Sequence, residues 1–145
     1  MTIFYRELSK IDSKTAVKDA FKVISASFYT NTDVEEKHKN TWLQWLEAYI
    51  ERLVFDMEQT DDDHSAFAKA RIEKMNKTNP KYVLRNYISQ LVIDAADQGD
   101  YELLGEVYEM LQNPYDEQPE FEKWYALRPE WARSKVGCSM LSCSS

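Results

Sequence analysis

The chain has 145 residues and a formal net charge of -7, and 43% of its residues are hydrophobic, 30% charged and 13% aromatic. This length suits one compact domain, and the apolar content is too high for a disordered chain. The acidic excess disfavours nucleic acid and anionic membranes as partners, because binding to both depends on clustered Lys and Arg. No stretch approaches the roughly 18 apolar residues of a membrane span, and the chain does not start like a secretory signal. We therefore expect a cytoplasmic protein with reduced thiols.

The composition favours an all-α fold, because three glycines and four prolines are too few turn formers for many short strands. The spacing of apolar residues predicts an irregular bundle of about six or seven helices. A short helix is expected over residues 2–8. Asp12 or Ser13 is expected to cap a second helix whose apolar residues recur from Ala16 to Phe28.

A long helix is predicted from about residue 32 to residue 57, where Thr32 and Glu35 have the spacing of a capping box. Its apolar stripe is the strongest in the chain and comprises Val34, Trp42, Trp45, Leu46, Tyr49, Ile50, Leu53, Val54 and Met57. A weaker helix follows the aspartates at 61–63, which suit the positive end of a helix dipole.

The second half of the sequence predicts an antiparallel helical hairpin at the centre of the fold. Asn79-Pro80 is expected to open its first helix, which runs to about Asp97. Gly99 is expected to supply a left-handed stop, and Asp100 to cap the next helix. The segment NPYDEQP at 113–119 predicts a rigid loop, followed by short helical segments near Phe121 and from Pro129.

The sequence predicts no catalytic, cofactor-binding or metal site within these residues. The two histidines, His38 and His64, lie far apart among charged residues, and solvent exposure is the preferred interpretation of both. The run Asp61-Asp62-Asp63 lacks the glycine and terminal glutamate of a calcium loop, so we interpret it as a helix start. The glycines are too widely spaced for a phosphate-binding loop.

The aromatic residues fall into two sets with different predictions. The first set is predicted to pack in the core because of its helical spacing: Trp42, Trp45, Tyr49, Tyr87 and Tyr108. For the second set, packing in a local core and contact with another domain are equally favoured interpretations. This set comprises Phe121, Trp124, Tyr125 and Trp131.

Both cysteines lie in the last ten residues, VGCSMLSCSS, which have no periodic pattern and are predicted to form a mobile tail at 136–145. The preceding residues, 1–135, are predicted to form one helical domain. Cys138 and Cys143 are not spaced like a zinc site. Three interpretations of Cys138 stay open: an inert thiol, which we rank first, a bridge to Cys143, or a resolving thiol for Cys143.

Five sequence blocks together resemble the C-terminal region of the selenoprotein O family. They are MNKTNPKYVLRNYISQ (75–90), AADQGDYELL (95–104), LQNPYDEQP (111–119), YALRPEWA (125–132) and CSS (143–145). Their order and spacing match the family, and the resemblance is strongest from Met75 onward.

The resemblance implies a protein adenylyltransferase with a kinase-like domain that uses ATP and Mg²⁺ or Mn²⁺ to place AMP on Ser, Thr or Tyr hydroxyls of other proteins. The catalytic and nucleotide-binding residues of the family would lie upstream, outside this sequence, and this region would pack on that domain. The family has selenocysteine or cysteine immediately before the final Ser-Ser, a position that Cys143 occupies here. The resemblance implies that Cys143 is redox-active and pairs with a cysteine of the kinase-like domain.

An alternative prediction is a stand-alone helical adaptor that binds a protein partner through its aromatic C-terminal surface. The terminal cysteine and the absence of a leader favour bacterial cytoplasm over an organelle matrix as the location.

Overall fold

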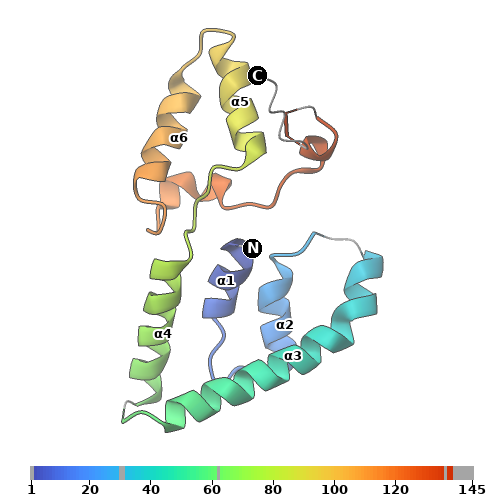
Figure 1. Ribbon diagram of the computed structural model, residues 1–145, viewed down its shortest axis with the longest axis vertical. Coiled ribbons are helices and arrows are strands. Elements are labelled where there is room, and N and C mark those ends of the chain that lie inside the picture. Colours follow the sequence, from blue (N-terminus) through green and yellow to red (C-terminus); the bar gives the residue numbers. More distant parts are fainter. Residues whose placement is uncertain (1, 30–31, 62, 136, 139–145) are drawn as a thin grey trace. The chain divides into compact units, whose positions relative to one another are not determined.

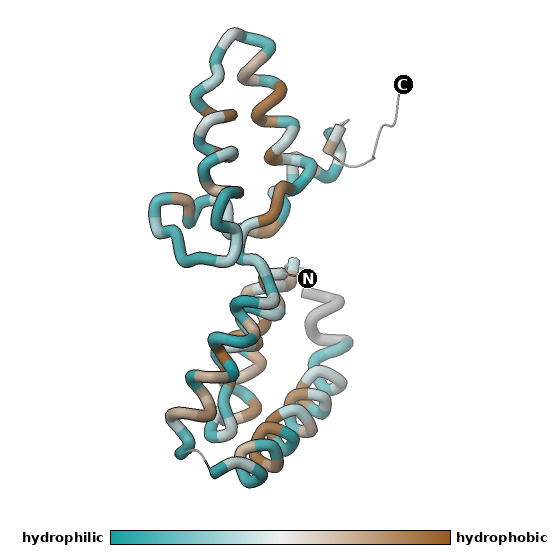
Figure 2. Tube along the Cα trace, turned by 60° about the vertical axis from the view of Figure 1, so that its left-hand side comes forward, coloured by the Kyte–Doolittle hydropathy of each residue, from teal (hydrophilic) through white to brown (hydrophobic). Residues whose placement is uncertain are grey.

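The computed structural model describes residues 2–29, 32–61, 63–135 and 137–138, with the backbone only for 32–37. The described residues form helices and connecting loops with no strand, which confirms the predicted all-α fold. Hydrophilic and hydrophobic residues both occur along the helices (Figure 2), as expected for helices that bury one face. The chain divides into two compact units, Met1–Asn79 and Pro80–Ser145.

The first unit contains four helices: α1 (Thr2–Ser9), α2 (Val17–Ser25), α3 (Thr32–Glu58) and α4 (His64–Thr78). Helix α2 packs on α3, and α1 packs on both α2 and α4 (Figure 1). The buried apolar core comprises Leu8, Ile11, Ala20, Phe21, Ile24 and Leu46. The first and third helices agree with the predicted bounds to within one residue.

The guanidinium of Arg71 on α4 connects three parts of the first unit. Its Nη1 donates a hydrogen bond to the Tyr49 hydroxyl on α3 at 2.9 Å. Its Nη2 donates to the backbone carbonyls of Ser9, at 2.8 Å, and Ile11, just after α1. Burial raises the pKa of Tyr49, and the positive charge of Arg71 opposes this only in part. Arg71 therefore donates to backbone carbonyls at the C-terminal end of α1 and just after it, where no intrahelical donor is available.

Replacing Arg71 with methionine is expected to lower the free energy of unfolding by about 2–3 kcal/mol, because the carbonyls of Ser9 and Ile11 lose their donor. Arg52→Met is the control, since Arg52 makes an exposed i,i+4 ion pair with Asp56, and its cost should stay within about 0.5 kcal/mol. Urea unfolding followed by circular dichroism measures both, and equal costs would contradict the role of Arg71.

The second unit contains α5 (Asn86–Ala96), α6 (Glu102–Gln112) and two 3-10 helices, η1 (Pro119–Trp124) and η2 (Glu130–Arg133). Helices α5 and α6 pack together as the predicted hairpin. The buried core comprises Tyr82, Tyr87, Ile88, Val107, Met110, Phe121, Ala132 and Cys138. The hairpin is thus central to the second unit, and the short segments near Phe121 and after Pro129 are confirmed as 3-10 turns.

The prediction that Asn79-Pro80 opens a helix is wrong. Helix α5 starts at Asn86, and the backbone amides of Lys81 and Tyr82 both donate to the Pro114 carbonyl, at 2.8 and 3.0 Å. The Tyr82 hydroxyl donates to the Gln118 carbonyl at 2.7 Å, and Tyr82 is 1% exposed. We call these contacts between Lys81, Tyr82, Pro114 and Gln118 the proline junction. The first amides of a helix have no intrahelical partner, so these bonds alone do not exclude a helix; they show that this segment is held against the loop at Pro114 before α5 begins.

The predicted helix caps have mixed outcomes. Asp12 and Ser13 do not cap α2, whose N-cap is Ala16; the Asp12 carboxylate instead accepts from the Lys14 amide and the Thr15 hydroxyl in a preceding turn. Asp63 belongs to the run that was predicted to precede a helix, and its carboxylate caps α4 by accepting from the Ala66 amide at 2.8 Å. The capping box of Thr32 and Glu35 lies outside the described side chains.

The turn between α5 and α6 follows the prediction for Gly99, whereas the N-cap of α6 is Tyr101 and not Asp100. Gly99 has a φ of 82°, a left-handed conformation that favours glycine. The Asp100 carboxylate accepts from the Glu102 amide at 2.9 Å, which satisfies one of the first free amides of α6.

The other two glycines, Gly105 and Gly137, differ in backbone conformation and in the space around them. Gly137 has a φ of 87°, and an added Cβ would collide with the Gln90 side chain. Gly105 lies inside α6, and an added Cβ would meet nothing within 4 Å. The fold therefore requires glycine at 137 but not at 105.

Gly105→Ala is expected to raise the free energy of unfolding by about 0.5–1 kcal/mol, because alanine loses less backbone entropy in a helix. Gly137→Ala is expected to lower it by about 1–2 kcal/mol through left-handed strain. Chemical denaturation of the two variants measures this difference in sign. A loss of stability for Gly105→Ala would show that α6 has a local need for glycine.

Candidate functional site

The histidines and aspartates do not form a catalytic or metal-binding group among the described residues. His38 is exposed on α3, as predicted. His64 is half-buried at the start of α4, and its Nε2 atom is buried without a described partner, so the prediction of exposure was wrong for His64. Asp61 is exposed, Asp63 caps α4 and Asp62 lies outside the described residues. No three metal-ligating side chains converge within the described chain.

Of the two predicted redox residues, the structure describes Cys138 and not Cys143. Cys138 is 3% exposed, free of any disulfide and part of the core of the second unit. Its amide donates to the Lys135 carbonyl at 3.1 Å. A thiol in this position is shielded from solvent reagents, which favours the inert interpretation of Cys138. Cys143 lies outside the described residues.

The chain before Cys138 is held along α5 at several points. The Trp131 ring packs edge-on against Tyr87 of α5, with ring centroids 6.2 Å apart. The Lys135 ammonium forms an ion pair with Asp94 of α5. Gly137 lies against the Gln90 side chain of the same helix. Trp131, Lys135 and Gly137 therefore each contact α5, and the tail at 136–145 stays a prediction because most of it lies outside the described residues.

A buried lysine reinforces the proline junction. The Lys81 side chain is 8% exposed, and its Nζ donates to Glu117 at 2.7 Å and to Glu122 at 2.5 Å. Nζ also lies over the rings of Tyr82 and Tyr125, at 5.5 and 5.2 Å from the centroids. Burial opposes the charged form, but the hydrogen bonds to the two glutamates outweigh it and raise the pKa of Lys81 above its ordinary value. Lys81 remains charged and links the junction to η1.

Lys81→Met is expected to lower the free energy of unfolding by about 1–2 kcal/mol at pH 7, because two charge-assisted hydrogen bonds are lost while the apolar stem is kept. A raised pKa stabilises the fold below the unfolded value of 10.5, and this contribution disappears as pH rises through the folded pKa. The difference between wild type and variant should therefore be constant from about pH 7 to 9 and shrink above pH 10.5.

Lys22→Met is the matched control, because Lys22 makes an exposed ion pair with Asp19 in the first unit. Urea midpoints at several pH values measure both variants. A Lys81→Met cost no greater than the control, or one that grows above pH 10.5, would refute this role of Lys81.

The core prediction for the first aromatic set holds for Tyr87 but fails for Trp45 and Tyr108. Tyr87 is 5% exposed, whereas Trp45 is 41% and Tyr108 is 66% exposed. Trp42 and Tyr49 are half-buried against the core of the first unit. Helical spacing identified the apolar side of each helix but did not reveal that these stripes are wider than the surface the neighbouring helices cover.

The second aromatic set belongs mainly to a local core. Phe121 is buried, and Trp124 and Tyr125 are half-buried against the same cluster. The Trp124 indole nitrogen donates to Glu106 at 2.7 Å. Trp131 is 43% exposed.

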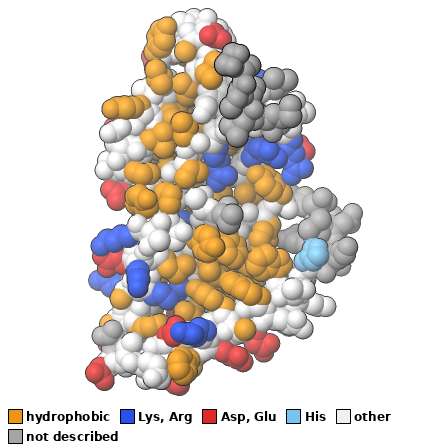
Figure 3. Space-filling view, viewed as in Figure 1, with side chains coloured by type: hydrophobic (Ala, Val, Ile, Leu, Met, Phe, Trp, Pro, Cys, Tyr) orange, Lys and Arg blue, Asp and Glu red, His pale blue; other side chains and the backbone are white. Residues whose placement is uncertain are grey.

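An aromatic cluster lies at the surface of the first unit, made of Phe4, Phe28, Trp42, Trp45 and Tyr49. Trp45 and Tyr49 stack at 5.3 Å with an interplanar angle of 11°. Hydrophobic side chains gather over α1 and α2 on the face seen in Figure 3. A hollow of about 370 Å³ is lined by Phe4, Thr41, Trp42 and Trp45, and such an apolar concave surface suits contact with an apolar segment.

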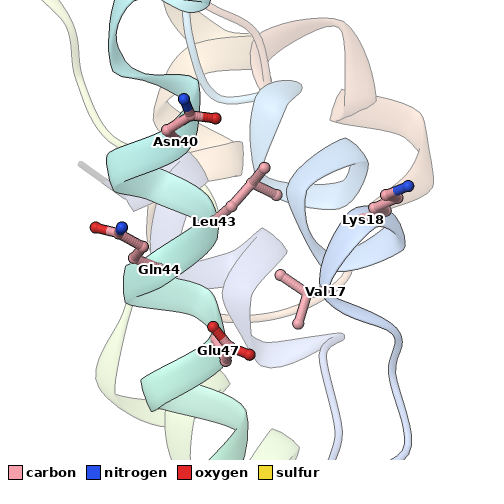
Figure 4. A pocket seen from close by; sticks show the side chains of 6 residues that line it. All are labelled: Val17, Lys18, Asn40, Leu43, Gln44 and Glu47. Carbon is pink, nitrogen blue, oxygen red and sulfur yellow. The ribbon is translucent and has the colours of Figure 1, made fainter.

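A second hollow of about 360 Å³ lies between α2 and α3 (Figure 4). Val17 and Leu43 form its apolar floor, and Lys18, Asn40 and Glu47 supply mixed polar groups around it. Among the described side chains that line this hollow, Lys18 is the only cation and no glycine is present.

Comparison with known proteins assigns the family. A family model described as protein adenylyltransferase SelO matches residues 1–112. The chain belongs to the SelO family. The match covers the first unit, where the resemblance seen in the sequence was weaker than from Met75 onward.

Relatives match over the whole chain. It is 50% identical to the protein nucleotidyltransferase YdiU of Flavobacterium johnsoniae over 145 residues, all of this chain and 26% of that protein. It is 42% identical to the protein of the same name from Rhodopirellula baltica over 152 residues, again all of this chain and 27% of that protein. The chain therefore spans about a quarter of the length of these SelO-family relatives.

Proposed function

We propose that this chain is the helical C-terminal region of a protein adenylyltransferase that transfers AMP from ATP to Ser, Thr or Tyr hydroxyls of other proteins. The observation that carries the proposal is the family match over residues 1–112 together with relatives, named nucleotidyltransferases, of which this chain spans only a quarter. A kinase-like domain elsewhere in the polypeptide would hold ATP and Mg²⁺ or Mn²⁺. The described side chains converge on no metal site of their own.

The role proposed for this region is to pack on the kinase-like domain and to present Cys143 as a redox-active thiol. The fixed position of Cys138 on the second unit supports this role, because it limits where Cys143 can reach. Four residues lie between the two positions, and the five Cα-to-Cα steps of an extended chain span at most about 18 Å. Adding the Cα separation of a disulfide places the partner cysteine within about 25 Å of Cys138.

The proposal predicts that the full-length polypeptide transfers AMP and that oxidation changes the rate. Cys143→Ser should abolish the difference between oxidised and reduced samples, since the tail thiol is then missing. Cys138→Ala should keep that difference, because Cys138 is buried away from any partner. The measurement is the incorporation of labelled AMP into a protein substrate.

Two results would overturn the proposal. Absence of AMP transfer by the full-length polypeptide would remove the assigned activity. An unchanged redox response in Cys143→Ser, with activity intact, would remove the role of the tail and leave the activity standing.

The alternative function is a helical adaptor that binds a protein partner. The apolar hollow lined by Phe4, Trp42 and Trp45 favours it, although the predicted C-terminal aromatic surface is largely buried. An adaptor would bind its partner with no polypeptide upstream of Met1, so an in-frame continuation of the gene upstream argues for the first function. We propose the bacterial cytoplasm as the location, which the bacterial origin of the named relatives supports.

A further inference from the structure

Helix α6 has one face in the core and one apolar face in solvent. Val107 and Met110 are 4% and 0% exposed, whereas Tyr101, Leu104 and Tyr108 are 63%, 47% and 66% exposed. At about 100° per residue, these three residues, Gly105 and Gln112 fall within an arc of about 100° opposite the core. We call this set the α6 outer face. Two large tyrosines and a leucine on one exposed helix face form a continuous apolar surface.

Gly105 lies within the α6 outer face and has no function in the described fold. Glycine inside a helix is less favourable than alanine, and no atom within 4 Å would obstruct a Cβ at this position. The use of glycine where backbones approach closely offers a physical reason for it. A helix or loop from elsewhere could approach the α6 backbone at Gly105, between the side chains of Tyr101, Leu104 and Tyr108.

The charges on α6 indicate which kind of protein surface would be complementary to the α6 outer face. The helix carries Glu102, Glu106 and Glu109 and has no lysine or arginine. Glu106 is engaged within the unit, by Lys123 at 2.6 Å and the Trp124 indole. Glu102 and Glu109 are exposed on one flank of the α6 outer face. A complementary surface is therefore apolar at its centre and carries lysine or arginine at its edge.

The same charges disfavour a second copy of this chain as the occupant. Two α6 helices packed antiparallel about Gly105 would bring Glu102 of one copy beside Glu109 of the other. Like charges opposed in this way are destabilising, and the net charge of -7 adds to the repulsion. The relatives carry about three quarters of their length outside the part matched here, and this polypeptide is the occupant that we propose.

We infer that the α6 outer face docks against an apolar, basic-edged surface in the part of the SelO-family polypeptide that lies outside these 145 residues, with Gly105 at the point of closest approach. The inference rests on the proposed function for the existence of that polypeptide, and it adds which surface of this region makes the contact.

Hydroxyl-radical oxidation of the full-length polypeptide, read by mass spectrometry, tests the contact without any substitution. Tyr108 is 66% exposed in this region and Tyr115 is 45% exposed, so a free surface predicts faster oxidation of Tyr108. Docking predicts the inverse order, with Tyr108 at least about threefold slower than Tyr115 after each rate is normalised to the urea-unfolded protein. Oxidation of Tyr108 faster than Tyr115 would overturn the inference.

A variant and a matched control test the role of Gly105. Gly105→Leu adds bulk at the point of approach, and it should return Tyr108 to faster oxidation than Tyr115 while the helix content is kept. Ala70→Leu adds the same bulk at an exposed helical position of α4 and should leave the order inverted. Continued protection of Tyr108 in Gly105→Leu would overturn the close approach at Gly105.

Two further readouts separate the competing explanations. If tenfold dilution removes the protection of Tyr108, the occupant is a second copy and the inference is overturned. AMP transfer is measured on the same sample. Transfer with Tyr108 exposed would overturn the docking and leave the proposed function standing. Protection of Tyr108 without transfer would overturn the proposed function and leave the docking standing.

Discussion

The second unit depends on the proline junction, where one carbonyl, that of Pro114, accepts the amides of both Lys81 and Tyr82. This contact closes the chain on itself between the segment before α5 and the loop after α6. Tyr82 is almost wholly buried there, and Lys81 extends the closure to Glu117 and Glu122. Because an unpaired backbone amide in such a place would cost the desolvation of a polar group, the junction fixes both ends of the hairpin together.

The two helices of the hairpin make different contacts outside their shared core. Helix α5 contacts Trp131, Lys135 and Gly137 through Tyr87, Asp94 and Gln90, respectively. Helix α6 uses Val107 and Met110 for the core and exposes the α6 outer face. The two helices thus present different surfaces: α5 contacts the described residues before Cys138, and α6 exposes the face for which we propose a docking role.

Local sequence signals predicted much of the fold. Periodicity located the long helix, Gly99 and Asp100 marked the hairpin turn, and Asp63 marked the start of α4. The errors arose where residues far away in the sequence determine the local conformation. Asn79-Pro80 has the local pattern of a helix start, but the amides of Lys81 and Tyr82 that follow it donate to the Pro114 carbonyl. For the candidate site, the burial of Lys81 and Cys138 depends on contacts between segments far apart in sequence, and no local pattern carries that information. The exposure of Trp45 and Tyr108 likewise depends on how much of each stripe a neighbour covers.

The central claim is that these helices support a catalytic domain and bind no nucleotide themselves. Calorimetric titration of ATP with Mg²⁺ tests it most directly, first into the 145-residue chain and then into the full-length polypeptide. The account predicts no heat of binding for the 145-residue chain and saturable binding for the full-length polypeptide. Saturable binding of ATP by the 145-residue chain alone would contradict the account.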